Sequence, residues 1–152
     1  MTLTRPLWLC IAALTTAYQP ASRTAAPELE YLTGPGMEEL DLPFSAAVRI
    51  GNLLYLSGMI GNLPGTMDLA PGGIRGETRQ ALDNVKATLE HVGSSMDRVV
   101  KCTVFLADMS EWQAMNEVYV TYFEHMPARS AVGASGLALG ARLEIECIAA
   151  VD

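Results

Sequence analysis

One stretch in which apolar residues recur at helical spacing among polar residues places the strongest constraint on the fold of this chain. In residues 76–93, Leu82, Val85, Leu89 and Val92 recur every three or four residues, and Gly93 follows as a helix stop. The sequence therefore predicts an amphipathic helix over residues 76–93. Such a helix buries one stripe only, so it must lie against another layer of structure.

The segments around this helix indicate that the other layer is a β-sheet. Residues 46–58 contain two apolar runs around Gly51-Asn52, a pair typical of a tight hairpin turn. Residues 98–106 are β-branched and apolar, which favours a strand. A second amphipathic helix is expected over residues 110–125, with Ser110 and Gln113 at capping-box spacing.

Residues 128–134 and 142–151 complete the pattern as the last two strands. We therefore expect an α+β domain of order ββαβαββ, with both helices on one face of the sheet. Residues 29–33 are a candidate for a short extra strand before it. The other face needs a cover, for which a closed trimer or dimer is suitable.

Composition limits the function classes. The chain has 152 residues, 50% hydrophobic, and a formal net charge of −7 with only two lysines. This charge disfavours general binding to nucleic acid. Cys10, Cys102 and Cys147 lack the spacing of zinc ligands. We expect Cys102 and Cys147 to be buried free thiols, with a disulfide between them left open.

The first 26 residues differ in character from the rest. Arg5 precedes an apolar stretch from Pro6 to about Ala17, and small polar residues follow. This pattern is typical of a secretory signal peptide and is too short for a membrane span. We expect a leader over residues 1–26, a single domain over residues 27–152, and export to the periplasm or outside the cell. The mature form is expected to lack a membrane segment, and a non-functional leader would leave the protein in the cytoplasm.

Charged residues in the last two strands are the candidates for chemistry. Glu144 and Glu146 alternate with Leu143, Ile145 and Cys147, so the two-residue period of a strand puts both glutamates on one face. A partly buried carboxylate needs a partner, and Arg129, on a strand near in sequence, is the obvious candidate.

Two interpretations of Arg129 and the glutamates stay open at this point. One is an ion pair that only closes the sheet or a subunit interface. The other is a site for a small carboxylate, because a guanidinium matches a carboxylate with two parallel hydrogen bonds. A nearby glutamate would then orient water or carry a proton.

The ordered motifs TRQALDNVKATLEHVG, VVKCTVFLADMSEW, NEVYVTYF, PARSAV and LEIECIAAV resemble the Rid (YjgF) family of reactive-intermediate deaminases, also called endoribonuclease L-PSP. The resemblance covers about residues 28–152. It implies a chorismate-mutase-like fold and a homotrimer with a barrel-like core and clefts between subunits. It also implies hydrolysis of 2-imino or enamine acids to 2-keto acids and ammonia, which detoxifies reactive intermediates without a metal or an organic cofactor.

The resemblance also implies roles for individual residues. Arg129 would bind the substrate carboxylate and Glu144 would hold the attacking water. Five further positions are expected to contact substrate: Phe44, Ser57, Gly58, Asn116 and Ala131. Many family members have tyrosine where this chain has Phe44 and cysteine where it has Ala131, so we expect substrate preference to differ there.

Two other function classes compete with deamination. A non-catalytic trimer that binds small carboxylates or acts as a chaperone is favoured by Phe44, by Ala131 and by the leader. A ribonuclease, suggested by the older family label, is disfavoured by the acidic charge and by the absence of a paired-histidine pattern.

Overall fold

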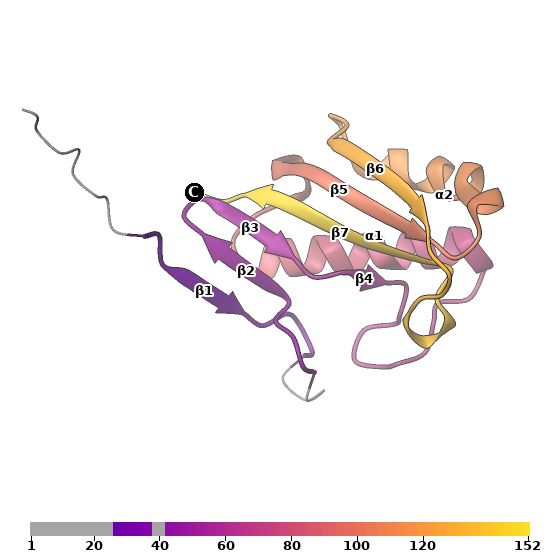
Figure 1. Cartoon of the computed structure of the whole chain (residues 1–152), viewed down its shortest axis with the longest axis horizontal. Coiled ribbons are helices and arrows are strands. Elements are labelled where there is room, and N and C mark those ends of the chain that lie inside the picture. Colours follow the sequence, from indigo (N-terminus) through magenta and orange to yellow (C-terminus); the bar gives the residue numbers. More distant parts are fainter. Residues whose placement is uncertain (1–25, 38–41) are drawn as a thin grey trace, which may run out of the picture.

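The computed structural model describes residues 26–37 and 42–152 (Figure 1). Nearly all of the expected leader, residues 1–25, lies outside the described residues. Within the described part, no helix has both the length and the apolar character of a membrane span.

One mixed sheet forms the centre of the domain. Its strands follow the spatial order β1-β2-β3-β7-β5-β6, and β4 also pairs with β7. All pairs are antiparallel except β5 with β6. The strands are β1 (Leu29–Leu32), β2 (Ala47–Ile50), β3 (Leu53–Leu56), β4 (Met59–Ile60), β5 (Val99–Leu106), β6 (Ala128–Gly133) and β7 (Leu143–Ala150).

The expected strands and hairpin are confirmed. β2 and β3 pair across the Gly51-Asn52 turn, where Gly51 has a φ of 58°. β1 is the short extra strand expected at the N-terminal end of the domain. β4 was not expected, because two residues show no periodicity from which a strand could be inferred.

Both expected helices are present with shifted ends. α1 spans Gly73–His91 and begins three residues early, at the point where Gly72 and Gly73 turn the chain with positive φ angles. α2 spans only Trp112–Tyr119, with a 3₁₀ turn on either side. The expected cap at Ser110 was wrong. The capping residue is Asp108, whose carboxylate accepts the Ser110 backbone N–H at 2.8 Å.

The helices cover one face of the sheet, as Figure 1 shows. On β7, Leu143, Ile145, Cys147 and Ala149 are buried in the core with apolar residues of both helices, while the alternate residues are not. The expected alternation is confirmed, and it places Glu144 and Glu146 on the face opposite the helices.

The face without helices is apolar along a row that crosses several strands. Tyr31, Val48, Tyr55 and Ile148 are successive cross-strand partners from β1 to β7. Tyr31 and Tyr55 are 69% and 46% exposed in the single chain. We call this surface the open face.

A disulfide joins Cys102 on β5 to Cys147 on β7. The two cysteines are direct cross-strand partners on the helix-covered face, with their Cα atoms 4.1 Å apart. Our expectation of free thiols was therefore wrong. Strand register brings the pair together, and the sequence separation of 45 residues did not reveal it.

Candidate functional site

The residues expected to form the site fall into two groups on opposite faces of the sheet. Arg129 is the register partner of Cys102, which pairs with the buried Cys147. Arg129 therefore points to the helix side. Glu144 pairs with Phe105, and its side chain lies on the open side.

The interpretation of Arg129 and the glutamates as an ion pair within one chain is therefore wrong. No ion pair in residues 26–37 and 42–152 joins Arg129 to Glu144 or Glu146. The period of a single strand correctly grouped the two glutamates. The face of β6 that carries Arg129 depends on its register with β5, which the sequence pattern does not contain.

The first group, which we call the arginine cluster, consists of Trp112, Asn116, Tyr119, Arg129 and Ala131. The Arg129 Cζ atom lies 4.5 Å from the centroid of the Tyr119 ring and 5.7 Å from that of Trp112. Both distances are within the range of cation–π attraction. Asn116 lies between the two aromatic residues on the same stripe of α2.

Burial governs the chemistry of Tyr119. The residue is 1% exposed, and its hydroxyl has no hydrogen-bond partner among the described residues. Burial raises the pKa of this hydroxyl to about 12, although the positive charge of Arg129 acts in the opposite direction. Tyr119 therefore presents a neutral ring to Arg129 at physiological pH.

The second group, which we call the glutamate cluster, consists of Phe44, Ser57, Gly58 and Glu144. Gly58 lies directly beside the Glu144 carboxyl group. A Cβ atom on Gly58 would overlap Oε1 and would come within 2.6 Å of Cδ. The backbone thus approaches the carboxylate closely at a position where only glycine leaves room.

Ser57, which precedes Gly58, hydrogen-bonds to the segment that follows Phe44. Its hydroxyl donates to the Ser45 carbonyl at 2.7 Å, and its backbone N–H donates to the Ala46 carbonyl at 2.9 Å. These bonds hold the segment that carries Phe44 against the end of β3. The Phe44 ring is 52% exposed.

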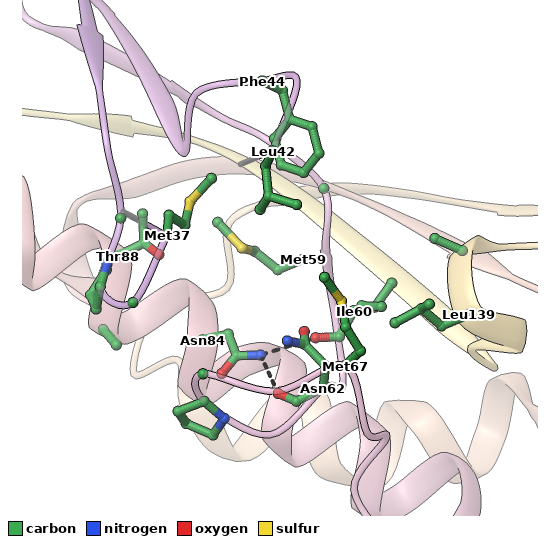
Figure 2. Close-up of a pocket in the computed structure, with 18 residues that line it drawn as sticks. Met37, Leu42, Phe44, Met59, Ile60, Asn62, Met67, Asn84, Thr88 and Leu139 are labelled. Carbon is green, nitrogen blue, oxygen red and sulfur yellow. Dashed lines mark hydrogen bonds between the residues drawn. The ribbon is translucent and has the colours of Figure 1, made fainter. Parts of the chain in front are cut away.

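A cavity of about 320 Å³ lies beside the glutamate cluster, with Phe44 and Gly58 in its lining. In Figure 2, Phe44 and Leu42 lie at one end of the lining, and Asn62 and Asn84 lie at the other. Asn84 donates to the carbonyls of Ile60 and Asn62 at 3.1 and 2.9 Å. The remaining lining is mostly apolar: Met37, Met59, Ile60, Pro64, Met67 and Leu139 among others.

The sequence did not reveal the contact of Arg129 with Trp112 and Tyr119. Both aromatic residues were expected on the apolar face of the second helix, and both are there. The signal that could have found the contact is their seven-residue spacing around Asn116, which aligns all three on one stripe. Within the described residues, no group of three or more histidine, cysteine or acidic side chains is suited to hold a metal ion.

Comparisons with known proteins agree with this architecture. The model of the family described as endoribonuclease L-PSP matches residues 39–151. The 2-iminobutanoate/2-iminopropanoate deaminase of Mus musculus is 44% identical over 108 residues, which cover 70% of this chain and 80% of the mouse protein.

Solved structures share the fold. The crystal structure of the yeast protein YEO7 has a TM-score of 0.76 and 37% identity, covering 82% of this chain and all of the yeast chain. The structure of E. coli TdcF with bound serine has a TM-score of 0.70 and 30% identity, covering 85% and 100%. This chain is therefore a member of the endoribonuclease L-PSP family, to which the Rid proteins belong.

Proposed function

We propose that this chain is an imine deaminase that hydrolyses small 2-imino acids to 2-keto acids and ammonia. The support in sequence is its similarity to several proteins named 2-iminobutanoate/2-iminopropanoate deaminase. The observation that carries the proposal is the pairing of two features: a carboxylate packed against a glycine backbone, and a guanidinium held by aromatic faces.

Arg129 is proposed to bind the substrate carboxylate. Its fork of N–H donors matches both oxygens of a carboxylate. Asn116 and the backbone of Ala131 lie on the same side of the sheet as Arg129 and are proposed to complete the contact. This holds one end of the substrate and leaves the imine carbon to be placed against Glu144.

Glu144 is proposed to accept and return the protons that move during hydrolysis. The oxygen of a water molecule attacks C2 of the protonated imine while Glu144 accepts a proton from that water. The product is a carbinolamine, which has a hydroxyl and an amino group on the same carbon. Glu144 returns the proton to the nitrogen, the C–N bond breaks and ammonia leaves. Glu144 accepts the hydroxyl proton as the keto group forms, and that proton then passes to the released ammonia. Positioning of the reactants supplies much of the acceleration in such a site.

A shared site requires a second copy of the chain, because one chain places the two clusters on opposite faces. β6, which carries Arg129, is an edge strand of the sheet and is available to approach a neighbour. The apolar open face also needs a cover. We therefore propose a homotrimer in which the arginine cluster of one subunit faces the glutamate cluster of the next.

The activity test uses 2-iminobutanoate generated from threonine in situ, with ammonia release as the readout. Wild type should accelerate ammonia release and Arg129→Ala should not. Arg75→Ala is the matched control, because Arg75 is an exposed arginine on α1 that pairs with Glu117. No acceleration by wild type over Arg129→Ala would reject the proposal.

A non-catalytic carboxylate-binding trimer is the second candidate. It is favoured by Phe44 and Ala131, which lack the hydroxyl and thiol that the family resemblance leads us to expect at these positions. Thermal-shift measurements with 2-keto acids separate the two candidates. Stabilisation by 2-ketobutyrate without turnover of the imine would favour binding alone.

We also propose that the protein is exported. The disulfide between Cys102 and Cys147 supports this, because disulfides persist in oxidising compartments. The signal-like pattern of residues 1–26 points the same way. The mass of the mature N-terminus in an exported fraction tests the proposal, and a full-length protein found only in the cytoplasm would contradict it.

A further inference from the structure

The guanidinium of Arg129 contacts two aromatic rings from a single helix. Its Cζ atom lies 4.5 Å from the Tyr119 centroid and 5.7 Å from the Trp112 centroid. Trp112 and Tyr119 are the first and last residues of α2, and β6 brings Arg129 to the stripe that they share. We infer that Trp112 and Tyr119 are positioning residues that hold the Arg129 guanidinium ready for a ligand carboxylate.

An aromatic ring holds a guanidinium differently from a carboxylate. The N–H donors of arginine lie in the plane of the group, whereas a ring attracts the cation through its π-face. The two rings can therefore fix Arg129 without occupying its donors. A protein carboxylate in their place would form the same bidentate pair that the ligand needs and would compete with it.

Tyr119 is well suited to this role because it is buried and neutral. Its ring is fixed in the core beside Phe123, with a centroid separation of 4.9 Å. A fixed ring restricts the rotamers of Arg129 and lowers the entropy lost when a ligand binds. Trp112, at 39% exposure, forms the outer side of this arrangement.

The inference rests on the proposed function but is tested through binding as well as turnover. The probe is 2-ketobutyrate, which is the product of 2-iminobutanoate hydrolysis and carries the same carboxylate. Trp112→Leu and Tyr119→Leu should each weaken its binding about five- to twentyfold by calorimetry. In turnover, KM should rise by a similar factor while kcat changes little.

Conservative variants distinguish an aromatic effect from simple loss of volume. Trp112→Phe and Tyr119→Phe should recover most of the binding lost in the leucine variants, because each restores a π-face. Tyr122→Leu is the matched control: Tyr122 also bridges to α1, through Asp83 and Arg79, but is not among the rings that contact Arg129. If Tyr119→Leu does not fold, 2-ketobutyrate binding by Trp112→Leu decides the test, because Trp112 is half-exposed.

Fluorescence gives a second readout. The chain has two tryptophans, so a full-length Trp8→Phe variant leaves Trp112 as the only one. Addition of 2-ketobutyrate should change its emission, and Arg129→Ala should abolish the change.

The outcomes separate this inference from the proposed function. Wild-type affinity within about twofold in both leucine variants, with binding lost in Arg129→Ala, would overturn the positioning role while leaving the deaminase proposal intact. Loss of binding in the leucine variants without any turnover by wild type would support the positioning role and reject deamination. If wild type binds no 2-ketobutyrate, the positioning role is rejected whatever the result for turnover.

Discussion

The arginine cluster and the glutamate cluster restrain their charged groups in different ways. Arg129 lies on an edge strand, and aromatic side chains of α2 contact its guanidinium. Glu144 lies on an inner strand, and the backbone at Gly58 is packed against its carboxyl group. Ring faces thus hold the Arg129 guanidinium. The Glu144 carboxylate packs against backbone, which can approach it because Gly58 has no side chain. Within residues 26–37 and 42–152, no ion pair joins either group to a partner of opposite charge.

The two clusters are too far apart within one chain to share a small substrate. Arg129 lies two strands away from β7 and three residues along β6 from the level of Glu144, or about 10 Å in each direction, on opposite faces. One small substrate cannot bridge them within a chain. The two clusters can act together only if different subunits supply them.

The comparison predicts different kinetic signatures for the two charged residues. Glu144→Gln removes the proton acceptor and should lower kcat about a hundredfold or more, with KM little changed. Arg129→Lys loses the bidentate geometry and should chiefly raise KM. Steady-state kinetics on 2-iminobutanoate measure both. If both variants changed only KM, Glu144 would be a binding residue and no proton acceptor.

Gly58→Ala tests the close approach at Glu144. The added methyl group would overlap the carboxylate, so Glu144 must turn away, and we expect kcat to fall at least tenfold. The fold should survive, because the displaced atoms are the end of a flexible side chain. Gly136→Ala is the matched control, since a Cβ there meets nothing within 4 Å. Equal activity in the two variants would show that the approach at Gly58 has no catalytic consequence.

Removal of the disulfide tests how the strands that carry the two clusters are held together. It joins β7, which carries Glu144, to β5, which pairs with the strand of Arg129. The double variant Cys102→Ala/Cys147→Ala should lose about 2–4 kcal/mol of unfolding free energy in denaturant titrations. A reducing agent should destabilise wild type and leave the double variant unchanged. Equal effects of the reducing agent on both proteins would argue that no disulfide is formed.

The smallest expected effect comes from removing a hydroxyl from Tyr119, a member of the arginine cluster, or from Tyr122, three residues later. The Tyr122 hydroxyl donates to the Asp83 carboxylate at 2.8 Å, whereas the Tyr119 hydroxyl has no partner among the described residues. Tyr122→Phe should therefore cost about 1 kcal/mol of stability, and Tyr119→Phe should cost less. Thermal unfolding compares them, and a larger loss for Tyr119→Phe would show that its hydroxyl has a partner in the assembled protein.

The sequence was sufficient to predict the main elements of the fold, because those elements depend on local pattern. The apolar period of residues 76–93 gave α1, and the Gly51-Asn52 pair gave the hairpin. β4 escaped prediction because it is held by pairing with β7, not by its own residues. The shorter α2 reflects 3₁₀ turns at both ends, and apolar residues spaced by three or four do not distinguish so short a 3₁₀ turn from an α-helical turn.

The candidate site shows where local pattern stops being informative. The period of β7 correctly placed Glu144 and Glu146 on one face. The relation of Arg129 to that face depends on two successive strand registers, so the ion pair inferred from proximity in sequence was wrong. The disulfide has the same origin, because Cys102 and Cys147 meet through register between β5 and β7.

Complementation between two inactive variants tests the shared site most directly. Arg129→Ala and Glu144→Gln, co-expressed with different tags and purified as mixed assemblies, each retain the residue that the other lacks. If neighbouring subunits supply Arg129 and Glu144 to one site, every mixed trimer contains one intact site out of three, so the purified mixed assemblies should show about a third of wild-type activity. Activity no higher than that of the separate variants, in assemblies shown to contain both tags, would contradict a site built from two subunits.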